Sequence, residues 1–213
     1  MAEQMGLFPG EDALQGPDLD VLLRRSVFDE QQALRLFDIL IEETPWQQDY
    51  ITMYGKQTPI PRRTAWFGET TAPYTYSGIT MAAHDWNEPD SKAAAAILEI
   101  RRTIEPIAET TFNSLLLNRY DSGKDGVAWH ADDEKELGPN PTIGSVTFGA
   151  TRKFQLRRRD DSSIKQEVEL HSGDLLVMRG ATQQEWLHQV PKTSREVGVR
   201  INLTFRTIAQ SSK

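Results

Sequence analysis

The sequence predicts a mainly β protein with flanking helices (α+β), built as a double-stranded β-helix, or jelly roll, with helices packed outside it. Two helical stretches occur before residue 110, and only strand-like stretches follow Phe112. Gly and Pro separate these short strands, and such a series of short strands after two helices indicates a double-stranded β-helix. At 213 residues the chain is long enough for one well-buried core, so we expect residues 21–208 to form one compact domain.

The first helix is indicated by apolar residues at helical spacing after Asp29, a candidate N-cap. Its core-facing residues are predicted to be Leu34, Phe37, Leu40 and Ile41.

A second helix is capped by Asp90 or Ser91 and is expected to close near Pro106. Its alanine run favours helix by propensity. The core-facing stripe is predicted to be Ile97, Ile100 and Ile104.

The remaining segments are assigned as strands, loops or a flexible arm. Residues 1–20 combine acids, Gly and Pro with few large apolar residues, which predicts a flexible acidic arm. Residues 46–81 are rich in aromatic and β-branched residues, Gly and Pro, which indicates short strands and loops. The later strands are expected at about 112–120, 127–132, 142–149, 152–158, 164–170, 174–179, 184–190 and 195–207.

Composition excludes several kinds of site. The chain has no cysteine, so disulfides, thiolate zinc sites and cysteine nucleophiles are excluded. No stretch approaches the roughly 18 uninterrupted apolar residues of a membrane helix, and the start of the chain does not resemble a signal peptide. We therefore expect a soluble protein with no membrane partner, cytoplasmic or, in a eukaryotic source, nuclear.

Charge is unevenly distributed. The formal net charge is −7, but residues 1–20 hold five acids and no Lys or Arg, so the remainder carries 24 basic against 26 acidic residues. A basic run spans Arg152–Arg159, and a smaller one is Arg62-Arg63. Such runs are typical either of phosphate contacts or of solvated strand ends, and the sequence leaves both interpretations open.

Three residues form a candidate metal site. His130 and Asp132 project to the same side of a strand, because successive side chains alternate faces, and His188 must reach them through the fold. Two imidazoles and one carboxylate suit non-haem Fe(II) and leave coordination positions open. His84 and His171 lie in loop-like segments and are interpreted as surface or turn residues.

The last predicted strand has one polar and one apolar face. Val197, Val199, Ile201, Leu203 and Phe205 form the apolar face, and Arg200, Asn202, Thr204 and Arg206 form the polar face. Arginine matches both oxygens of a carboxylate, so this face indicates an anionic ligand; salt bridges on a solvated barrel face are the alternative. Asn118 and Tyr120 share a face of their own strand and offer donors to ligand oxygens.

These motifs together resemble the AlkB family of Fe(II)- and 2-oxoglutarate-dependent dioxygenases, in its nucleic-acid dealkylating branch. The resemblance runs from about Arg62 to Ile208, roughly two-thirds of the chain. The matching segments are Phe112-Asn113, Asn118–Tyr120, His130–Glu134, Ile143–Ala150, Arg152–Phe154, Gly173–Met178, Trp186–Pro191 and Arg200–Arg206.

The resemblance implies the cofactor residues and the domain plan. His130, Asp132 and His188 would bind Fe(II). Arg206 would pair with the distal carboxylate of 2-oxoglutarate, and Arg200 would lie toward the metal and Asp132. The remaining 2-oxoglutarate residues would be Asn118, Tyr120 and Asn202. Residues 111–208 would form the double-stranded β-helix, and residues 21–110 the helices and a nucleotide-recognition lid.

The resemblance also implies substrate contacts. The residues expected to contact the substrate are Arg62, Trp66, Phe67, Tyr74, Tyr76 and Ser77, with Arg152 as a phosphate contact from the basic run. The aromatic rings among them could instead pack in the core or in a hairpin. Asp133 and Glu134 directly follow the ligands and are predicted to attract a cationic methylated base and so to assist catalysis.

The implied function is oxidative demethylation of N-alkylated bases in DNA, of the 1-methyladenine or 3-methylcytosine type. The N-methyl group would be hydroxylated with Fe(II), O₂ and 2-oxoglutarate, releasing formaldehyde, succinate and CO₂. The expected partner is DNA carrying alkylated bases, with RNA as a further candidate, and the protein is expected to be a monomer. Two alternatives stay open: the same chemistry on RNA, a protein or a small molecule, and a non-catalytic β-barrel binding module.

Overall fold

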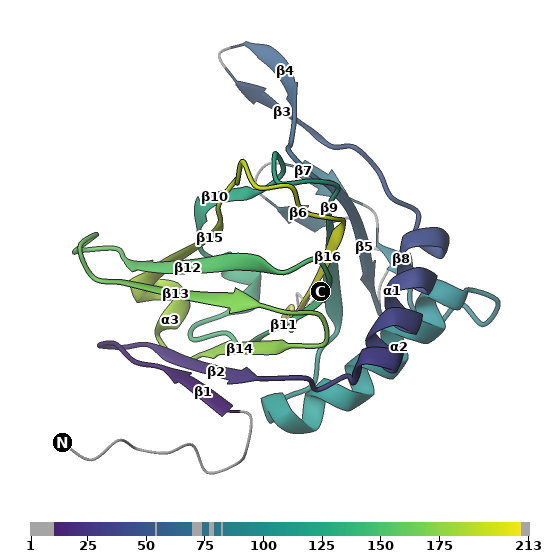
Figure 1. Ribbon diagram of the computed structural model, residues 1–213, viewed down its shortest axis with the longest axis horizontal. Helices are drawn as coiled ribbons and strands as arrows, with labels where there is room; N and C mark the ends of the chain where they lie inside the picture. The colour runs from purple at the N-terminus through teal and green to yellow at the C-terminus, as the bar shows by residue number, and fades with distance from the viewer. Residues whose placement is uncertain (1–10, 54, 70–73, 77–78, 82, 210–213) are drawn as a thin grey trace.

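Two facing β-sheets, with two helices on the outside of the larger one, make up the computed structural model (Figure 1). It describes residues 11–53, 55–69, 74–76, 79–81 and 83–209. Neighbouring strands are antiparallel except β5 and β8, which are parallel. The large sheet has the order β1 (Glu11–Leu14), β2 (Asp20–Arg24), β14 (Leu175–Arg179), β11 (Ile143–Gly149), β16 (Arg200–Arg206), β9 (Ser114–Tyr120), β5 (Arg63–Gly68) and β8 (His84–Asp85).

The smaller sheet and two hairpins complete the strands. The four strands of the smaller sheet are β10 (Val127–His130), β15 (Trp186–Val190), β12 (Arg152–Arg158) and β13 (Lys165–Leu170). The hairpins are β3 (Tyr50–Met53) with β4 (Lys56–Pro59), which projects from the body in Figure 1, and β6 (Tyr74–Tyr76) with β7 (Ile79–Met81). Two facing sheets of mainly antiparallel strands confirm the predicted double-stranded β-helix.

Helix α1 (Glu30–Glu43) begins where the sequence predicts. Asp29 and Gln32 form a reciprocal capping box at its start. The predicted apolar face was partly wrong, because Leu34 is 60% exposed whereas Ala33 and Leu36 are buried beside Leu40. Apolar residues are so frequent in this helix that its sequence fits more than one face, and the small Ala33 marks the side that approaches the sheet.

Helix α2 (Lys92–Ala108) is capped by the Ser91 hydroxyl and continues beyond its predicted end at Pro106. Pro106 lies in the last turn, where only one backbone hydrogen bond is lost, and the helix ends at Glu109 in a left-handed conformation. Ile97, Ile100 and Ile104 are fully buried, as predicted.

The two helices pack against the outer face of the large sheet. Their apolar residues share one core cluster with alternate residues of β9 and β16: Leu115, Leu117, Ile201, Leu203 and Phe205. A second cluster fills the space between the two sheets at one end, around Trp186 and Phe154. The intervening side chains of β9 and β16 therefore point into the space between the sheets.

The predicted strands after Phe112 agree with the structure to within about two residues, except at one place. The strand expected to run to Asp132 ends two residues earlier, at His130, but the one expected from residue 195 begins only at Arg200. Val197 and Val199 therefore lie outside β16, because the ladder between β11 and β16 ends at the pair Gly149 and Arg200.

The acidic arm predicted for residues 1–20 differs from the structure in its second half. Residues 1–10 lie outside the described residues, but Glu11–Leu14 pairs with β2. Residues 15–19, here called the strap, are held by side chains of the smaller sheet: Trp186 Nε1 donates to Pro17 O at 3.0 Å and Gln166 Nε2 to Gln15 O at 2.8 Å. Main-chain carbonyls accept these hydrogen bonds, so the amino-acid composition of the segment does not show that it is held in place.

The division expected at residue 110 cuts through a sheet. Strands β2 and β5 precede that residue, yet they lie in the large sheet beside β14 and β9. With β8, which pairs with β5, the chain before residue 110 thus contributes three strands to the large sheet after β1, as well as the helices and hairpins. Among the described residues, no helix is long and apolar enough to cross a membrane.

Candidate active site

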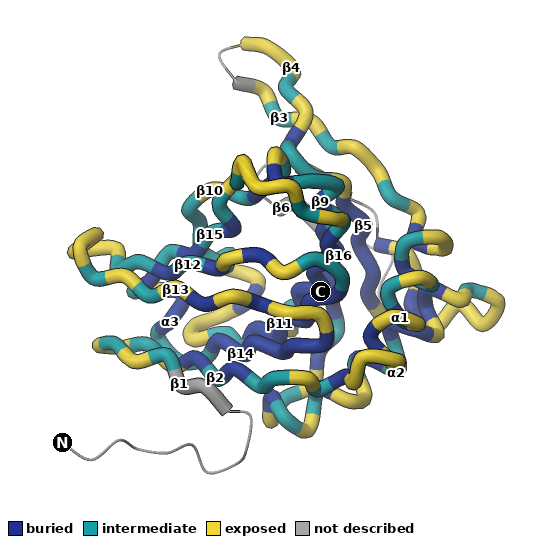
Figure 2. The backbone as a smooth tube through the Cα atoms, in the orientation of Figure 1, coloured by how far each residue is buried: buried dark blue, intermediate teal, exposed yellow. Residues whose placement is uncertain are grey.

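A cavity lies between the two sheets, where the smaller sheet approaches β9 and β16. It contains about 470 Å³ of free space including its open mouth. Its polar lining consists of Arg62, Asn118, Tyr120, His130, Asp132, Ser145, His188, Arg200, Asn202, Thr204 and Arg206. The strands around it are largely buried (Figure 2).

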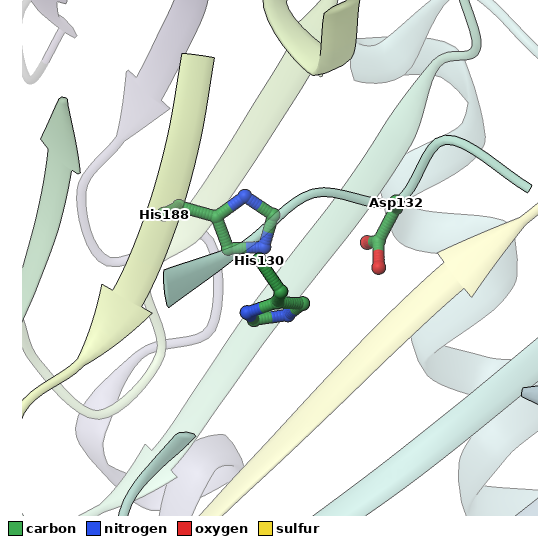
Figure 3. A group of neighbouring side chains, drawn as sticks. All are labelled: His130, Asp132 and His188. Carbon is green, nitrogen blue, oxygen red and sulfur yellow. The ribbon is translucent and has the colours of Figure 1, made fainter. Parts of the chain in front are cut away.

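The three predicted metal ligands converge at one part of this cavity. His130 on β10 lies opposite His188 on β15, and their ring centroids are 4.3 Å apart. Asp132 follows on the loop after β10, and one ligand atom from each residue lies within 4.8 Å of the other two. Figure 3 shows the two imidazoles side by side with the carboxylate beside them. The three ligands would lie on one side of a bound metal ion, so the coordination positions that face the cavity would stay open.

Burial holds both imidazoles in their metal-binding form. It lowers the pKa of His188 to about 3, with the neighbouring His130 acting in the same direction, and it also lowers the pKa of His130. Nδ1 of His130 lies 2.8 Å from Ala128 O, which can only accept, so Nδ1 carries the proton and Nε2 is left for an ion. Phe154 stacks on His188 with ring centroids 5.4 Å apart.

Asp132 is held from two sides. Its carboxylate Oδ1 accepts from Arg206 Nη2 at 2.8 Å, and its main-chain N–H donates to Gln183 Oε1 at 2.9 Å. Burial alone would raise the pKa of Asp132, but Arg206 and the two histidines hold it at about 2. The carboxylate is therefore ionised at neutral pH and fixed in orientation.

The two arginines lie at opposite ends of the cavity, since six residues along a strand span about 20 Å. Arg206 pairs with Asp132, whereas Arg200 Nη2 donates to Thr147 Oγ1 at 3.0 Å and the Arg200 guanidinium lies 5.2 Å from the Tyr120 ring. The prediction that Arg200 lies toward Asp132 and Arg206 away from it was therefore wrong. The sequence gives the spacing of the two arginines along β16, but it does not show which of them lies beside the loop after β10.

Arg200 has the properties of an anion-binding group. It is 1% exposed, and its Nε and Nη1 have no hydrogen-bond partner within the described ranges. Burial lowers the pKa of Arg200 to about 10, which leaves it cationic. A buried, incompletely bonded guanidinium is costly unless an anion joins it. The residues that line this cavity suit a dicarboxylic acid that binds a metal through one end and Arg200 through the other.

Asn118 and Asn202 line the cavity, as expected, but protein atoms already bond to their amides. Asn118 Oδ1 accepts from Arg62 Nε at 2.7 Å, and Asn202 Nδ2 donates to Ser145 Oγ at 2.8 Å. Tyr120 lies opposite Arg200 across the β9–β16 pair and is buried. The two amides therefore shape the cavity and orient their neighbours.

Of the predicted substrate residues, Arg62 reaches the cavity and two aromatic residues do not offer a stacking face. Trp66 and Phe67 are each 2% exposed, Phe67 in the core below the helices and Trp66 against Leu116. That prediction was wrong, and core packing, the alternative, applies because β5 is covered on both faces. Strand β6 contains Tyr74 and Tyr76, but their side chains and Ser77 lie outside the described residues.

Arg152 was also assigned wrongly as a phosphate contact. It is 5% exposed, and its guanidinium donates to the carbonyls of Ser122, Asp125 and Pro191. Strand alternation turns Arg152 inward with Phe154 and Leu156.

The rest of the basic run is largely paired on the surface. Arg158 contacts Asp18, Asp160 and Glu185. Arg159 pairs with Asp133, and the Arg157 guanidinium lies 4.4 Å from the Trp129 ring centroid. The run therefore contributes less free positive charge than its composition suggests.

Asp133 and Glu134 do not line the cavity. Asp133 is exposed and forms an ion pair of 2.6 Å with Arg159. Burial, followed by the negative charge of Asp132, raises the pKa of Glu134. Their contact with a cationic base stays a prediction.

Sequence reasoning missed Gln183 and Thr147. Thr147 faces the polar side of β16 from β11, and strand alternation could have found it. Gln183 lies on a one-turn helix, α3 (Thr182–Glu185), and no local pattern distinguishes it from Gln184. The other two histidines, His84 and His171, are both exposed, in agreement with their interpretation as surface or turn residues.

Comparisons with known proteins agree with this geometry. A family model described as the 2OG-Fe(II) oxygenase superfamily matches residues 20–206. The alpha-ketoglutarate-dependent dioxygenase alkB homolog 3 of Mus musculus is 40% identical over 196 residues, covering 88% of this chain and 66% of the relative. The DNA oxidative demethylase ALKBH2 of Arabidopsis thaliana is 36% identical, covering 92% and 68%, and that of Bos taurus is 32% identical, covering 99% and 76%.

A solved structure shows the same fold. The structure of OsALKBH1 matches with a TM-score of 0.62 at 16% identity, covering 92% of this chain and 99% of that chain. In length, this chain spans 63 to 66% of the alkB homolog 3 relatives from Mus musculus, Rattus norvegicus and Bos taurus.

Proposed function

Because the chain belongs to the 2OG-Fe(II) oxygenase superfamily and, within it, to the AlkB family, we propose that it is an oxidative demethylase that repairs N-alkylated bases in DNA. The substrate bases are of the 1-methyladenine and 3-methylcytosine type, and the products are the repaired base, formaldehyde, succinate and CO₂. The observation that carries the proposal is one cavity that joins a His-Asp-His triad to a buried, incompletely bonded arginine. The relatives named DNA oxidative demethylase support DNA as the substrate.

Different residues of the cavity would bind the metal, the cosubstrate and the substrate. His130, Asp132 and His188 hold Fe(II), and Arg200 holds the distal carboxylate of 2-oxoglutarate. When bound, Fe(II), 2-oxoglutarate and O₂ supply the oxidising power that hydroxylates the N-methyl carbon.

The protein's own contribution is to hold its ligands ready and to exclude water. Arg206 keeps Asp132 ionised and oriented, and burial keeps His188 neutral. Apolar side chains, among them Leu116, Phe154 and Val190, line the same cavity and limit water near the reacting carbon. Arg62 lines the cavity and is hydrogen-bonded to Asn118, which supports its proposed contact with the substrate.

A substrate panel tests this function. Anaerobically Fe(II)-loaded protein is given 2-oxoglutarate and then air with methylated single-stranded DNA, methylated duplex DNA, methylated RNA or methyl-lysine peptide, and formaldehyde and succinate are measured. We expect formaldehyde from methylated DNA, abolished by His130→Ala and retained by the matched surface variant His171→Ala.

Each alternative predicts a different result. Formaldehyde from RNA or peptide but not from DNA would show the same chemistry on another substrate. Absence of succinate in every reaction would favour a binding module without catalysis.

We further propose that the protein acts as a monomer in the cytoplasm, or in the nucleus of a eukaryotic source. Size-exclusion chromatography with light scattering tests whether it is a monomer.

A further inference from the structure

Arg152 is a buried cation that the proposed mechanism does not use. Its three hydrogen bonds, of 3.3, 2.9 and 2.6 Å, go to the main-chain carbonyls of Ser122, Asp125 and Pro191. These carbonyls belong to the loops that follow β9 and β15, so Arg152 joins both loops to β12. Carbonyl oxygens solvate a guanidinium, but they do not neutralise its charge.

No described carboxylate forms a salt bridge with Arg152. The carboxylate that acts on it electrostatically is Asp125. Asp125 Oδ2, however, accepts from the main-chain N–H groups of Asp121 and Ser122. Asp125 therefore serves mainly to fix the loop, and much of the Arg152 charge is left for another partner.

Tyr120 connects Arg152 to the cavity. The Arg152 guanidinium lies 6.0 Å from the centroid of the Tyr120 ring, and the Arg200 guanidinium lies 5.2 Å from the same ring. Tyr120 is 2% exposed, so contacts with its neighbours fix the ring position. Two cations beside one ring are each attracted to the ring and repelled by one another.

The two guanidinium charges act on each other through this buried region. Burial is the main cause that lowers the pKa of Arg200. The interaction with Tyr120 raises this pKa, and the charge of Arg152 lowers it. Two buried cations that repel each other would both be stabilised by one anion bound beside Arg200. A group with a full negative charge at that position would be attracted by both guanidinium groups.

We propose that Arg152 is a positioning residue for 2-oxoglutarate: it fixes Tyr120 against Arg200 and adds a second positive charge at the end of the cavity that receives the distal carboxylate. This inference rests on the proposed placement of 2-oxoglutarate with its distal carboxylate at Arg200. It predicts that Arg152 favours 2-oxo acids that end in a carboxylate over those with an uncharged end.

The experiment measures 2-oxo acid binding without turnover. Full-length protein is loaded with Mn(II), and calorimetry gives the dissociation constants of 2-oxoglutarate and of 2-oxopentanoate, which lacks the distal carboxylate. Removing the charge with Arg152→Gln or Arg152→Met should raise the dissociation constant of 2-oxoglutarate by on the order of tenfold. Binding of 2-oxopentanoate should change by less than about twofold, since its tail carries no charge.

The variants separate charge from structure. Glutamine can still donate to a carbonyl, methionine keeps the length of the stem, and Arg152→Lys restores the charge and should recover most of the 2-oxoglutarate affinity. The matched control is Lys165→Met, which removes one positive charge from an exposed position at the start of β13. It should leave both dissociation constants unchanged.

Three results would overturn the inference. Equal weakening of both acids would show that Arg152 only maintains the loops, and unchanged 2-oxoglutarate binding would show that its charge has no effect. Wild-type protein that binds Mn(II) but not 2-oxoglutarate would overturn the inference together with the proposed function. The first two results, obtained with normal wild-type binding, would overturn the inference alone.

Discussion

At the level of single residues, the surroundings of His188 determine its protonation. The side chain is 6% exposed between Phe154 and His130, and its pKa lies near 3 instead of 6.5. An unfolded chain exposes the imidazole and binds a proton with an ordinary pKa. Protonation therefore favours the unfolded state at mildly acidic pH.

We predict that the metal-free protein loses stability as pH falls from 7 to 5. The folded pKa of His188 is the lower one, so its contribution is fully present above about pH 6.5 and is lost below it, by up to about 1.4 kcal/mol per pH unit. His130 acts in the same direction. Urea unfolding at several pH values, with chelator present, measures the slope. His188→Gln should flatten it, and an equal slope in the variant would contradict the assignment.

Residue types at the site were predictable from sequence, but their orientation was not. The shared face of the two arginines follows from strand alternation, since a side chain's face depends only on local geometry, whereas the grouping of His188 with His130 and Asp132 follows from their ligand chemistry and the resemblance to the AlkB family. Which arginine meets Asp132 depends on how the loop after β10 crosses the sheet. Trp66 and Arg152 were misassigned for a related reason, because burial depends on strands far away in the chain.

At the level of elements, the one-turn helix α3 supports the metal site. Its Gln183 is 1% exposed and bonds to the main chain of Asp132, and Arg159 Nη2 donates both to Gln183 O at 3.0 Å and to the Asp133 carboxylate. These contacts attach the ligand loop to α3. Support of this kind commonly changes metal affinity although it does not touch the metal.

We predict that Gln183→Leu weakens Mn(II) binding by about tenfold or more, because the Asp132 N–H loses its buried acceptor and the carboxylate loses its fixed position. The measurement is a Mn(II) titration followed by electron paramagnetic resonance. Gln184→Leu on the exposed side of the same helix is the matched control. Equal affinities in the two variants would rule out this role for Gln183.

Element boundaries were predictable where they depend on local chemistry. The capping residues Asp29 and Ser91 mark both helix starts, and turns rich in Gly and Pro separate most strands. The start of β16 and the pairing of β1 were not predictable, since both depend on which strands are available as neighbours. Pairing partners are a property of the complete sheet.

At the level of the whole molecule, the two sheets and the helix layer meet at Gly149. The chain leaves the large sheet there, at the end of β11, and enters the smaller sheet at β12. Gly149 has φ +82°, and a Cβ atom at this position would lie 2.4 Å from Val199 O and 2.6 Å from a Phe37 ring carbon. Both contacts are closer than packed atoms allow.

We predict that Gly149→Ala lowers the free energy of unfolding by more than Gly138→Ala does. Both glycines have positive φ, a backbone cost of about 1–3 kcal/mol for alanine, but Gly138 has open space around it. The clash at Gly149 should add about 1–3 kcal/mol. Urea unfolding at pH 7 measures both variants, and equal losses would show that the neighbouring Val199 and Phe37 move aside without cost.

The position of β16 has a consequence for how the protein is made. This strand is the last one in the described chain, yet it lies in the middle of the large sheet between β11 and β9. During synthesis the earlier strands emerge without their central partner, so the sheet closes only when residues 200–206 leave the ribosome. Arg200 and Arg206 arrive on that same strand. Closure of the sheet and completion of the anion-binding cavity are therefore one event in folding.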